Sequence, residues 1–265
     1  MNVKKVLYFD VDGTIVSNED KLLVEEKVFR RLMQDGVLTA VATGRTPLHI
    51  MRLVNKIGFN FYNIIADGQV LFYQGNYIVN KMFGKTDYIH IANLLKEEYY
   101  IICEYENGYF YFDKMASRIF GHVFGSEKNY IVGGVEKYTG LFNVPFRIFV
   151  ASKQYQKSEI IKKKIDLELT GFADVFCYGD LWLELRPQNL NKRDAFLLAK
   201  KLSEQKEKYE YSYFADGKND ILMMQEVDCG FAVGDAAEEL ICLRKCQYIE
   251  NISLYLKLVQ KDLEK

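Results

Sequence analysis

In the first third of the chain, continuous apolar runs alternate with segments whose apolar residues recur at helical spacing. Continuous apolar runs at 6–10, 38–42 and 63–66 have the length and composition of strands that are buried on both faces. Between these runs, residues 21–35 and 46–57 carry apolar side chains at helical spacing. Strands that alternate with helices predict a doubly wound, parallel α/β sheet.

The pattern changes after about residue 70, where pairs of strand-like runs flank short turn sequences. Runs 101–105 and 109–112 flank Glu106-Asn107-Gly108, and Asn-Gly favours the tight turns of β-hairpins. The same kind of reading predicts hairpins at 70–79 and 174–185, a strand at 146–151, and helices at 87–98 and 153–169. Antiparallel hairpins mixed with helices indicate a separate α+β domain over residues 82–186.

The doubly wound pattern resumes after this insertion. The predicted elements are a helix at 193–202, strands at 211–215 and 230–233, and helices at 219–227, 235–245 and 251–263. The expected fold is therefore an α/β parallel sheet, formed by residues 1–81 and 187–265, with an inserted α+β domain.

Composition excludes several classes of partner. The 265 residues include 35 basic and 36 acidic side chains, a balance that gives no electrostatic footprint for nucleic acid. No apolar stretch approaches the roughly 20 residues of a membrane helix. A strand begins within the first ten residues, so we expect no cleaved signal peptide. We expect a cytoplasmic protein, monomeric or homodimeric, without a nucleic-acid or membrane partner.

The first candidate motif is Asp10-Val11-Asp12-Gly13-Thr14, directly after the apolar run 6–9. Side chains alternate along a strand, so Asp10 and Asp12 leave the same face of it. Two carboxylates this close repel each other unless a cation or a shared proton compensates. A divalent metal ion with phosphate chemistry would supply that compensation, and a functionless acidic turn is the alternative.

A similar arrangement recurs near residue 216. The run 211–214 reads as a strand that ends at Asp216, and Asn219 and Asp220 begin the next predicted helix. The carboxyl ends of parallel strands meet at one edge of the sheet, which is where such sheets bind ligands. Asp and Asn also favour turns and helix N-caps, so each residue taken alone has a structural explanation.

Two further segments complete the set. Thr43-Gly44-Arg45 follows the strand at 38–42, and Pro47 just beyond it is typical of the first turn of a helix, whose free N–H groups attract anions. Lys192 begins the predicted helix after the insertion. Two acidic clusters, one hydroxyl and one lysine are the groups needed to hold Mg²⁺ and a phosphoryl group.

In order and context these segments resemble the four motifs of the haloacid dehalogenase-like superfamily, in particular its Cof-type sugar-phosphatase branch, subclass IIB. The resemblance runs from Val6 to about Leu258 and includes a long insertion between the second and third motifs. The first and fourth motifs are specific, and Thr43 and Lys192 gain weight from their place between them. The resemblance implies a Rossmann-like core and makes the insertion a cap domain.

The resemblance also implies roles for four aspartates. Asp10 is the implied nucleophile, which forms an aspartyl phosphate. Asp12 is the implied general acid and base. Asp10, Asp12 through its main-chain carbonyl, Asp216 and Asp220 form the implied Mg²⁺ site, with Asp220 holding or orienting a water molecule on the metal.

Phosphate binding is implied for a second set. Thr43, Gly44, Lys192 and Asn219 are expected to hold the transferring oxygens, with Lys192 as a fixed positive charge. Arg45 is expected to bind a substrate phosphate or a cap carboxylate, and an ordinary surface salt bridge is the alternative.

Two positions depart from the family pattern. Many relatives have glycine where Ala215 stands and asparagine where Asp67 stands. Alanine is small enough to be tolerated unless the backbone needs a positive φ. Asp67 adds a negative charge near the expected substrate entrance and is expected to influence specificity.

The sequence thus predicts a Mg²⁺-dependent phosphatase for a small phosphorylated metabolite, with sugar phosphates as the class implied by the resemblance. One alternative keeps the aspartyl phosphate and transfers it to an acceptor sugar, as a phosphotransferase or phosphomutase does. The other alternative is a non-catalytic protein that binds a phosphorylated metabolite.

Overall fold

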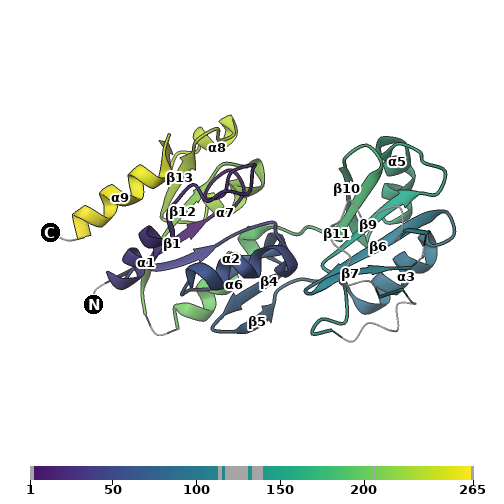
Figure 1. Ribbon diagram of the computed structural model, residues 1–265, viewed down its shortest axis with the longest axis horizontal. Coiled ribbons are helices and arrows are strands. Elements are labelled where there is room, and N and C mark those ends of the chain that lie inside the picture. The colour runs from purple at the N-terminus through teal and green to yellow at the C-terminus, as the bar shows by residue number, and fades with distance from the viewer. Residues whose placement is uncertain (1–2, 113–114, 117–130, 133–139, 206, 264–265) are drawn as a thin grey trace. The chain divides into compact units, whose positions relative to one another are not determined.

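The computed structural model describes residues 3–112, 115–116, 131–132, 140–205 and 207–263 (Figure 1). The chain forms two compact units. The core unit comprises Met1–Arg45, His49–Asn80 and Asn191–Lys265, and the inserted unit comprises Thr46–Leu48 and Lys81–Leu190.

Within its described residues, the core unit contains a five-stranded parallel sheet in the order β14-β13-β12-β1-β2. The strands are β1 (Lys4–Phe9), β2 (Leu38–Val41), β12 (Tyr209–Ala215), β13 (Cys229–Val233) and β14 (Cys246–Ile249). The predicted parallel α/β sheet is therefore confirmed. β12 and β2 pair with the two edges of β1, and helices cover both faces of the sheet, so residues 6–9 are buried on both sides, which explains their continuous apolar sequence.

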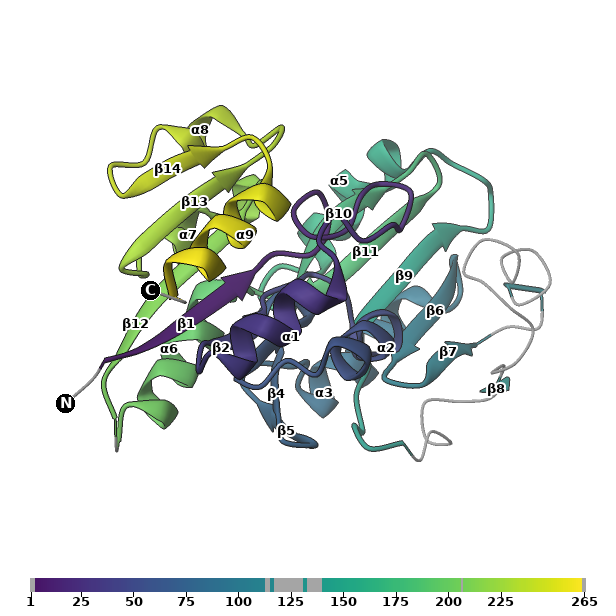
Figure 2. The ribbon, with the colours of Figure 1, turned by 60° about the vertical axis from the view of Figure 1, so that its left-hand side comes forward.

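Helices cover both faces of this sheet. They are α1 (Glu26–Gln34), α2 (Pro47–Ile57), α6 (Lys192–Ser203), α7 (Ile221–Met224), α8 (Glu238–Ile241) and α9 (Ile252–Leu263). On one face, Tyr8 and Tyr211 contact Phe196 of α6 edge to face. On the opposite face, α1 and α9 lie next to each other (Figure 2). There Phe214 stacks between Phe9 and Phe231.

A small antiparallel sheet follows α2 in the core unit. It consists of β3 (Asn63–Ile65), β4 (Val70–Tyr73) and β5 (Asn76–Val79), with the short 3₁₀ turn η1 (Ala66–Gly68) after β3. The run at 63–66 was expected to be a third strand of the parallel sheet. Instead, it pairs with β4, and one parallel bridge from Ile64 to Ala42 links it to the main sheet.

Within the described residues, the inserted unit has a six-stranded sheet in the order β10-β11-β9-β6-β7-β8. The bounds are α3 (Lys85–Leu95), β6 (Tyr99–Tyr105), β7 (Gly108–Tyr111), β8 (Ile131–Val132), β9 (Arg147–Ser152), α5 (Ser158–Glu168), β10 (Ala173–Tyr178) and β11 (Trp182–Pro187). Apolar side chains of α3 and α5, among them Ile91 and Ile165, pack on one face of this sheet. The pairings are antiparallel except for β7 with β8, as the predicted hairpins require.

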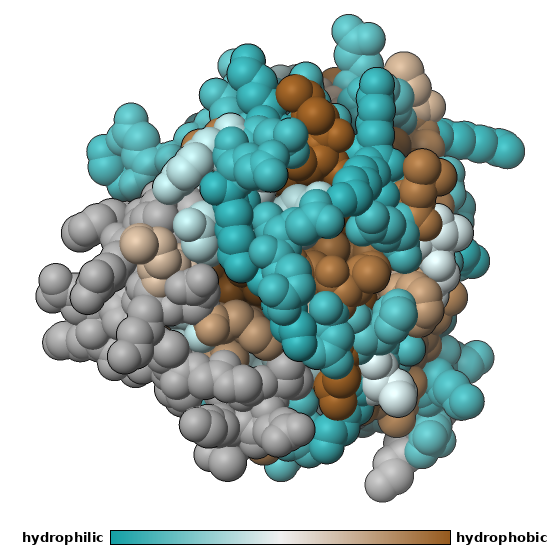
Figure 3. Space-filling model, turned by 90° about the vertical axis from the view of Figure 1, so that its right-hand side faces the viewer, coloured by the Kyte–Doolittle hydropathy of each residue, from teal (hydrophilic) through white to brown (hydrophobic). Residues whose placement is uncertain are grey.

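On the face drawn in Figure 3, apolar side chains lie in patches among hydrophilic side chains. In the inserted unit the exposed apolar residues come from different elements, for example Leu94 on α3, Ile160 and Leu167 on α5, and Phe176 on β10. Among the described residues, no helix combines the length and apolar character needed to cross a membrane.

Several helix predictions are wrong in their extent. The helix predicted at 153–169 begins at Ser158, and the one predicted at 219–227 is α-helical only over Ile221–Met224. The first helix begins at Glu26 instead of residue 21, because Leu22 bridges to Val16 and Leu23 donates its N–H to Ile15. The helix predicted at 235–245 is the single turn α8, and the chain then enters the parallel strand β14. That strand was missed because its four residues lie at the sheet edge and lack an apolar run.

Candidate active site

The carboxyl ends of β1 and β12 bring the first and last motifs together. Phe9 and Phe214 are register partners, and the N–H of Asp10 donates to the carbonyl of Phe214 at 2.8 Å. Asp10 and Asp216 therefore follow two hydrogen-bonded neighbouring strands. Gly13 completes the turn at a φ of 81°, and a Cβ there would lie 2.2 Å from Oδ2 of Asp216. Both the backbone conformation and the close approach require glycine.

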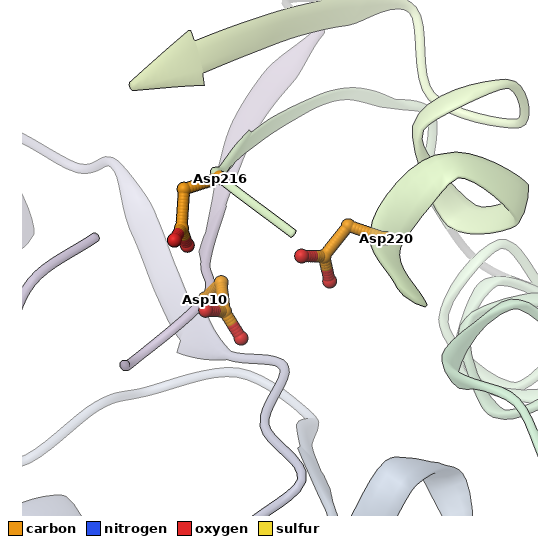
Figure 4. Close-up of side chains that lie close together, drawn as sticks. All are labelled: Asp10, Asp216 and Asp220. Atoms are coloured by element: carbon orange, nitrogen blue, oxygen red, sulfur yellow. The ribbon is translucent and has the colours of Figure 1, made fainter. Parts of the chain in front are cut away.

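Three carboxylates converge at this edge of the sheet. Asp10, Asp216 and Asp220 each place an oxygen so that the three oxygens lie within 4.8 Å of one another (Figure 4). Asp220 closes the 3₁₀ turn η3 (Lys218–Asp220), where its Oδ2 accepts the N–H of Gly217 at 3.1 Å. Asp216 is held by the hydroxyl of Thr14, which donates to its Oδ1 at 2.9 Å.

Lys192 lies between two of these carboxylates. It is the first residue of α6, whose N-cap Asn191 accepts the N–H of Asp194. The Lys192 ammonium donates to Oδ1 of Asp10 and to Oδ1 of Asp220, each at 2.6 Å. The side chains of all three residues are at most 9% exposed, so these ion pairs form away from solvent.

Charge is unbalanced in this buried cluster. Three carboxylates face one ammonium, which leaves two surplus negative charges when all groups are ionised. Burial raises the pKa of Asp10 well above its usual value, with Lys192 opposing the shift and Asp220 adding to it. Burial likewise raises the pKa of Asp216. Burial alone would lower the pKa of Lys192, but Asp10 and Asp220 outweigh it and the pKa is raised, so the lysine stays charged.

A buried tyrosine, which sequence reasoning missed, joins the cluster. The hydroxyl of Tyr213 donates to Oδ1 of Asp220 at 2.5 Å and lies 3.4 Å from the Lys192 ammonium. Alternation along β12 places Tyr213 on the same sheet face as Tyr211, the face covered by α6. The sequence signal that could have identified Tyr213 was its place on this face of β12, because Lys192 begins the helix that covers the face.

The second motif lies in a tightly bonded loop after β2. Thr43 is fully buried, its N–H donates to the carbonyl of Ile64, and its hydroxyl accepts the N–H of Arg45 at 3.0 Å. Asp67 is buried at a φ of 53° and donates its own N–H to the carbonyl of Thr43. Its carboxylate lies against Gly44, where a Cβ would approach Oδ1 to 3.0 Å. The charge of Asp67 also acts on Lys192, so this loop borders the cluster.

Arg45 pairs with carboxylates of its own unit. Its Nε and Nη2 donate to Oδ1 of Asp12 at 3.0 and 2.6 Å, and Nη2 also donates to Oδ1 of Asp20 at 2.7 Å. The Asp12 side chain is 56% exposed and that of Asp20 is 79% exposed. Asp12 is thus held by a guanidinium and is not a member of the three-carboxylate cluster.

Asn219 is placed differently from the other predicted residues. It lies in η3 with an exposed side chain, between Asp216 and Asp220 in the chain. Its Oδ1 packs over Gly217, where a Cβ would approach it to 2.4 Å. The structure therefore gathers Asp10, Asp216, Asp220 and Lys192 tightly, and leaves Asn219 at the surface nearby.

With this geometry in view, the comparison with known families is decisive about class. Residues 7–251 match the family model described as haloacid dehalogenase-like hydrolase. The chain belongs to this family. The resemblance stated from the motifs is confirmed.

Individual relatives agree with this class. Phosphatase YwpJ of Bacillus subtilis is 29% identical over 68 residues, which cover 25% of this chain and 24% of that protein. The crystal structure of TM0651 from Thermotoga maritima has a TM-score of 0.76 at 18% identity and covers 98% of this chain and 97% of its own. The subclass IIB sugar phosphatase BT4131 has a TM-score of 0.61 at 17% identity, covering 97% and 99%. The structural likenesses show the fold.

Proposed function

We propose that this enzyme is a Mg²⁺-dependent phosphatase that hydrolyses small phosphomonoesters through an aspartyl phosphate on Asp10. One observation carries the proposal: Asp10, Asp216 and Asp220 converge at the carboxyl edge of a parallel sheet, where the buried ammonium of Lys192 bridges Asp10 and Asp220. Anionic ligands and their cations bind at this edge in open α/β folds.

The donor set fits a hard divalent cation. All three side chains offer carboxylate oxygens, the ligands that Mg²⁺ prefers, and the two surplus negative charges of the cluster match its charge. We propose that Asp10 and Asp216 hold the ion directly, together with the main-chain carbonyl of Asp12. Asp220 would orient a water of the ion. When bound, Mg²⁺ supplies charge that stabilises the transferring phosphoryl group.

The proposed reaction divides hydrolysis into two displacements. An oxygen of the Asp10 carboxylate attacks phosphorus and the bond to the substrate oxygen breaks, while Asp12 gives its proton to the leaving alcohol. Water then attacks the phosphorus of the aspartyl phosphate. Asp12 takes a proton from this water, and the P–O bond to Asp10 breaks, which releases phosphate and restores both carboxyl groups.

The remaining residues bind and position. We propose that Lys192, Thr43, Gly44 and Asn219 hold the phosphoryl oxygens, with Lys192 as the fixed positive charge in a water-poor site. Arg45 already binds the Asp12 carboxylate through two nitrogens. A substrate phosphate on Arg45 would have to share the guanidinium with Asp12 and Asp20.

We propose that the segment 82–186 is the cap domain that selects the substrate. The inserted unit has its own sheet and its own apolar core, as a separate specificity domain requires. Sugar phosphates are the proposed substrate class, supported by a neighbour of the same fold that is a sugar phosphatase. We propose a cytoplasmic protein, monomeric or homodimeric, that acts on small metabolites without a nucleic-acid partner.

Phosphate release from a panel of small phosphate esters tests this function. The wild type is assayed with Mg²⁺ and with EDTA, beside Asp10→Asn and the control Asp180→Asn, which removes an exposed carboxylate of the inserted unit. We expect Mg²⁺-dependent release by the wild type and the control, and a loss of at least about 10³-fold in Asp10→Asn.

The fate of the phosphoryl group separates hydrolysis from transfer. In ¹⁸O-labelled water, hydrolysis incorporates one solvent oxygen into each released phosphate. A phosphorylated acceptor sugar, formed without release of phosphate, would instead establish a phosphotransferase. Phosphate binding without turnover of any ester would establish a binding protein.

A further inference from the structure

Two tyrosines face each other across the central strands of the core sheet. Tyr8 on β1 and Tyr213 on β12 are register partners, and neither is exposed to solvent. Both belong to the apolar cluster beneath α6. The two rings therefore occupy equivalent places in the same packing layer.

Their hydroxyl groups have opposite surroundings. The hydroxyl of Tyr8 is buried and has no hydrogen-bond partner among the residues that the structure describes. The hydroxyl of Tyr213 donates to Asp220 and lies within hydrogen-bond distance of Lys192. Burying a hydroxyl without a hydrogen bond costs free energy. Of these two hydroxyls, only that of Tyr213 has hydrogen bonds that offset this cost.

The acceptors around the Lys192 ammonium indicate what the hydrogen bonds of Tyr213 do. An ammonium has three N–H bonds, and three acceptors surround this one: Asp10 and Asp220 at 2.6 Å and the Tyr213 oxygen at 3.4 Å. The hydroxyl of Tyr213 donates its hydrogen bond to Asp220 and accepts one from Lys192. It thereby fixes the carboxylate that holds the lysine and fills the third, longest position around the ammonium.

We propose that Tyr213 is a positioning residue for the phosphoryl-transfer site, acting through Asp220 and Lys192. Tyr213 holds the ammonium of Lys192 beside Asp10. When a phosphoryl oxygen binds, it replaces the Tyr213 oxygen as the acceptor of the third N–H of Lys192. The longest of the three contacts is the one that such an oxygen replaces at least cost. This inference rests on the proposed function.

The test compares Tyr213→Phe with the matched control Tyr8→Phe, since each removes one buried hydroxyl from the same layer. With saturating Mg²⁺ and the best ester of the panel, we expect kcat of Tyr213→Phe to fall about tenfold to hundredfold. We expect its KM to rise together with this loss, because the phosphoryl group of the ester binds at the same ammonium, and we expect Tyr8→Phe to match the wild type in both constants. Equal kcat values for both variants would overturn the proposal.

A double-mutant cycle checks the route through Asp220. If Tyr213 acts by fixing this carboxylate, Tyr213→Phe lowers kcat by less than about twofold in an Asp220→Asn background. The same factor in both backgrounds would show that Tyr213 does not act through Asp220. Thermal unfolding of each variant separates this effect from a loss of folded protein, because a purely structural hydroxyl lowers Tm and leaves kcat of the folded enzyme unchanged.

A binding measurement separates this proposal from the proposed function. Inorganic phosphate is titrated calorimetrically into each protein with Mg²⁺ present, and we expect Kd to rise about tenfold in Tyr213→Phe and to stay unchanged in Tyr8→Phe. If the wild type releases no phosphate from any ester but shows this pattern, the hydrolytic function fails and the role of Tyr213 stands. Equal affinities, or no phosphate binding by the wild type, overturn the role.

Discussion

The core unit contains two ion-pair networks of similar design in very different surroundings. In each, one cation bridges two aspartates: Lys192 bridges Asp10 and Asp220, and Arg45 bridges Asp12 and Asp20. The shortest contacts of the two networks are nearly identical, 2.6 Å twice in the first and 2.6 and 2.7 Å in the second.

Burial distinguishes the two networks. In the first network the side chains are 1–9% exposed, and in the second they are 25–79% exposed. Removing one member of a buried network leaves charges that water cannot reach, whereas exposed pairs are screened by water and salt. Distance alone therefore does not decide which network matters for stability and chemistry.

Removing each cation gives the sharpest contrast. Lys192→Met leaves two buried carboxylates without a counterion, and we expect it to lower the free energy of unfolding by about 3–5 kcal/mol. Arg45→Met frees two carboxylates that water already solvates, and we expect a loss below about 1 kcal/mol. Urea unfolding in EDTA at neutral pH measures both. Equal losses would contradict the distinction between the networks.

The next largest expected effect is the gain in stability on binding Mg²⁺. At Mg²⁺ concentrations a hundredfold above Kd, binding to the folded state stabilises the protein by about 2.7 kcal/mol. We expect Asp216→Asn to abolish this gain, because the variant removes a proposed ligand. Asp12→Asn keeps its main-chain carbonyl and should retain the gain. The measurement is Tm with and without Mg²⁺, and a gain that survives in Asp216→Asn would remove this residue from the site.

The buried network also predicts a dependence on pH. Burial raises the pKa of Asp10 above its usual value of 3.8, so the native state holds its proton more tightly than the unfolded chain does. The free energy of unfolding therefore falls as pH rises from the unfolded pKa through the native pKa. Asp10→Asn removes this titration, and we expect it to be more stable than the metal-free wild type by about 0.5–2 kcal/mol near neutral pH.

Unfolding curves of both proteins in EDTA from pH 4.5 to 8 measure this difference. The stability advantage of Asp10→Asn should grow with pH. An advantage that is constant or shrinks with rising pH would show that the carboxyl of Asp10 is not destabilised by burial.

The smallest effect concerns the exposed network and its response to salt. Asp20→Asn removes one of two carboxylates from Arg45, and we expect a change in stability below about 0.5 kcal/mol that disappears in 1 M NaCl. The control is Asp220→Asn, the equivalent change in the buried network, whose effect should persist in salt. A salt-resistant effect of Asp20→Asn would place its ion pair among the buried ones.

The convergence of the acidic residues could be predicted from the sequence. Asp10 and Asp216 each follow an apolar strand, and parallel strands end at a common edge, so their convergence follows from pattern and topology alone. Lys192 was recognisable as the start of a helix after the insertion. These inferences need only local periodicity and the order of elements along the chain.

Other features depend on tertiary contacts that no local pattern contains. Arg45 was expected to bind a substrate phosphate or a cap carboxylate, or to form a surface salt bridge. Its actual pairing with Asp20 involves a loop residue whose own φ is 56°. Tyr213 reads as one more aromatic residue of a strand, and its hydroxyl gains meaning only from Lys192 and Asp220. The edge strand β14 lacks the apolar run that marks the central strands.

The most direct test of the phosphatase mechanism is detection of the phosphate on Asp10. Wild-type enzyme is mixed with Mg²⁺ and its best ester, quenched in acid within the first turnovers, digested and analysed by mass spectrometry. We predict transient phosphorylation of the peptide that contains Asp10, with release of inorganic phosphate, and neither in Asp10→Asn. Phosphate release at an undiminished rate by Asp10→Asn, without a phosphorylated peptide in the wild type, would contradict the mechanism.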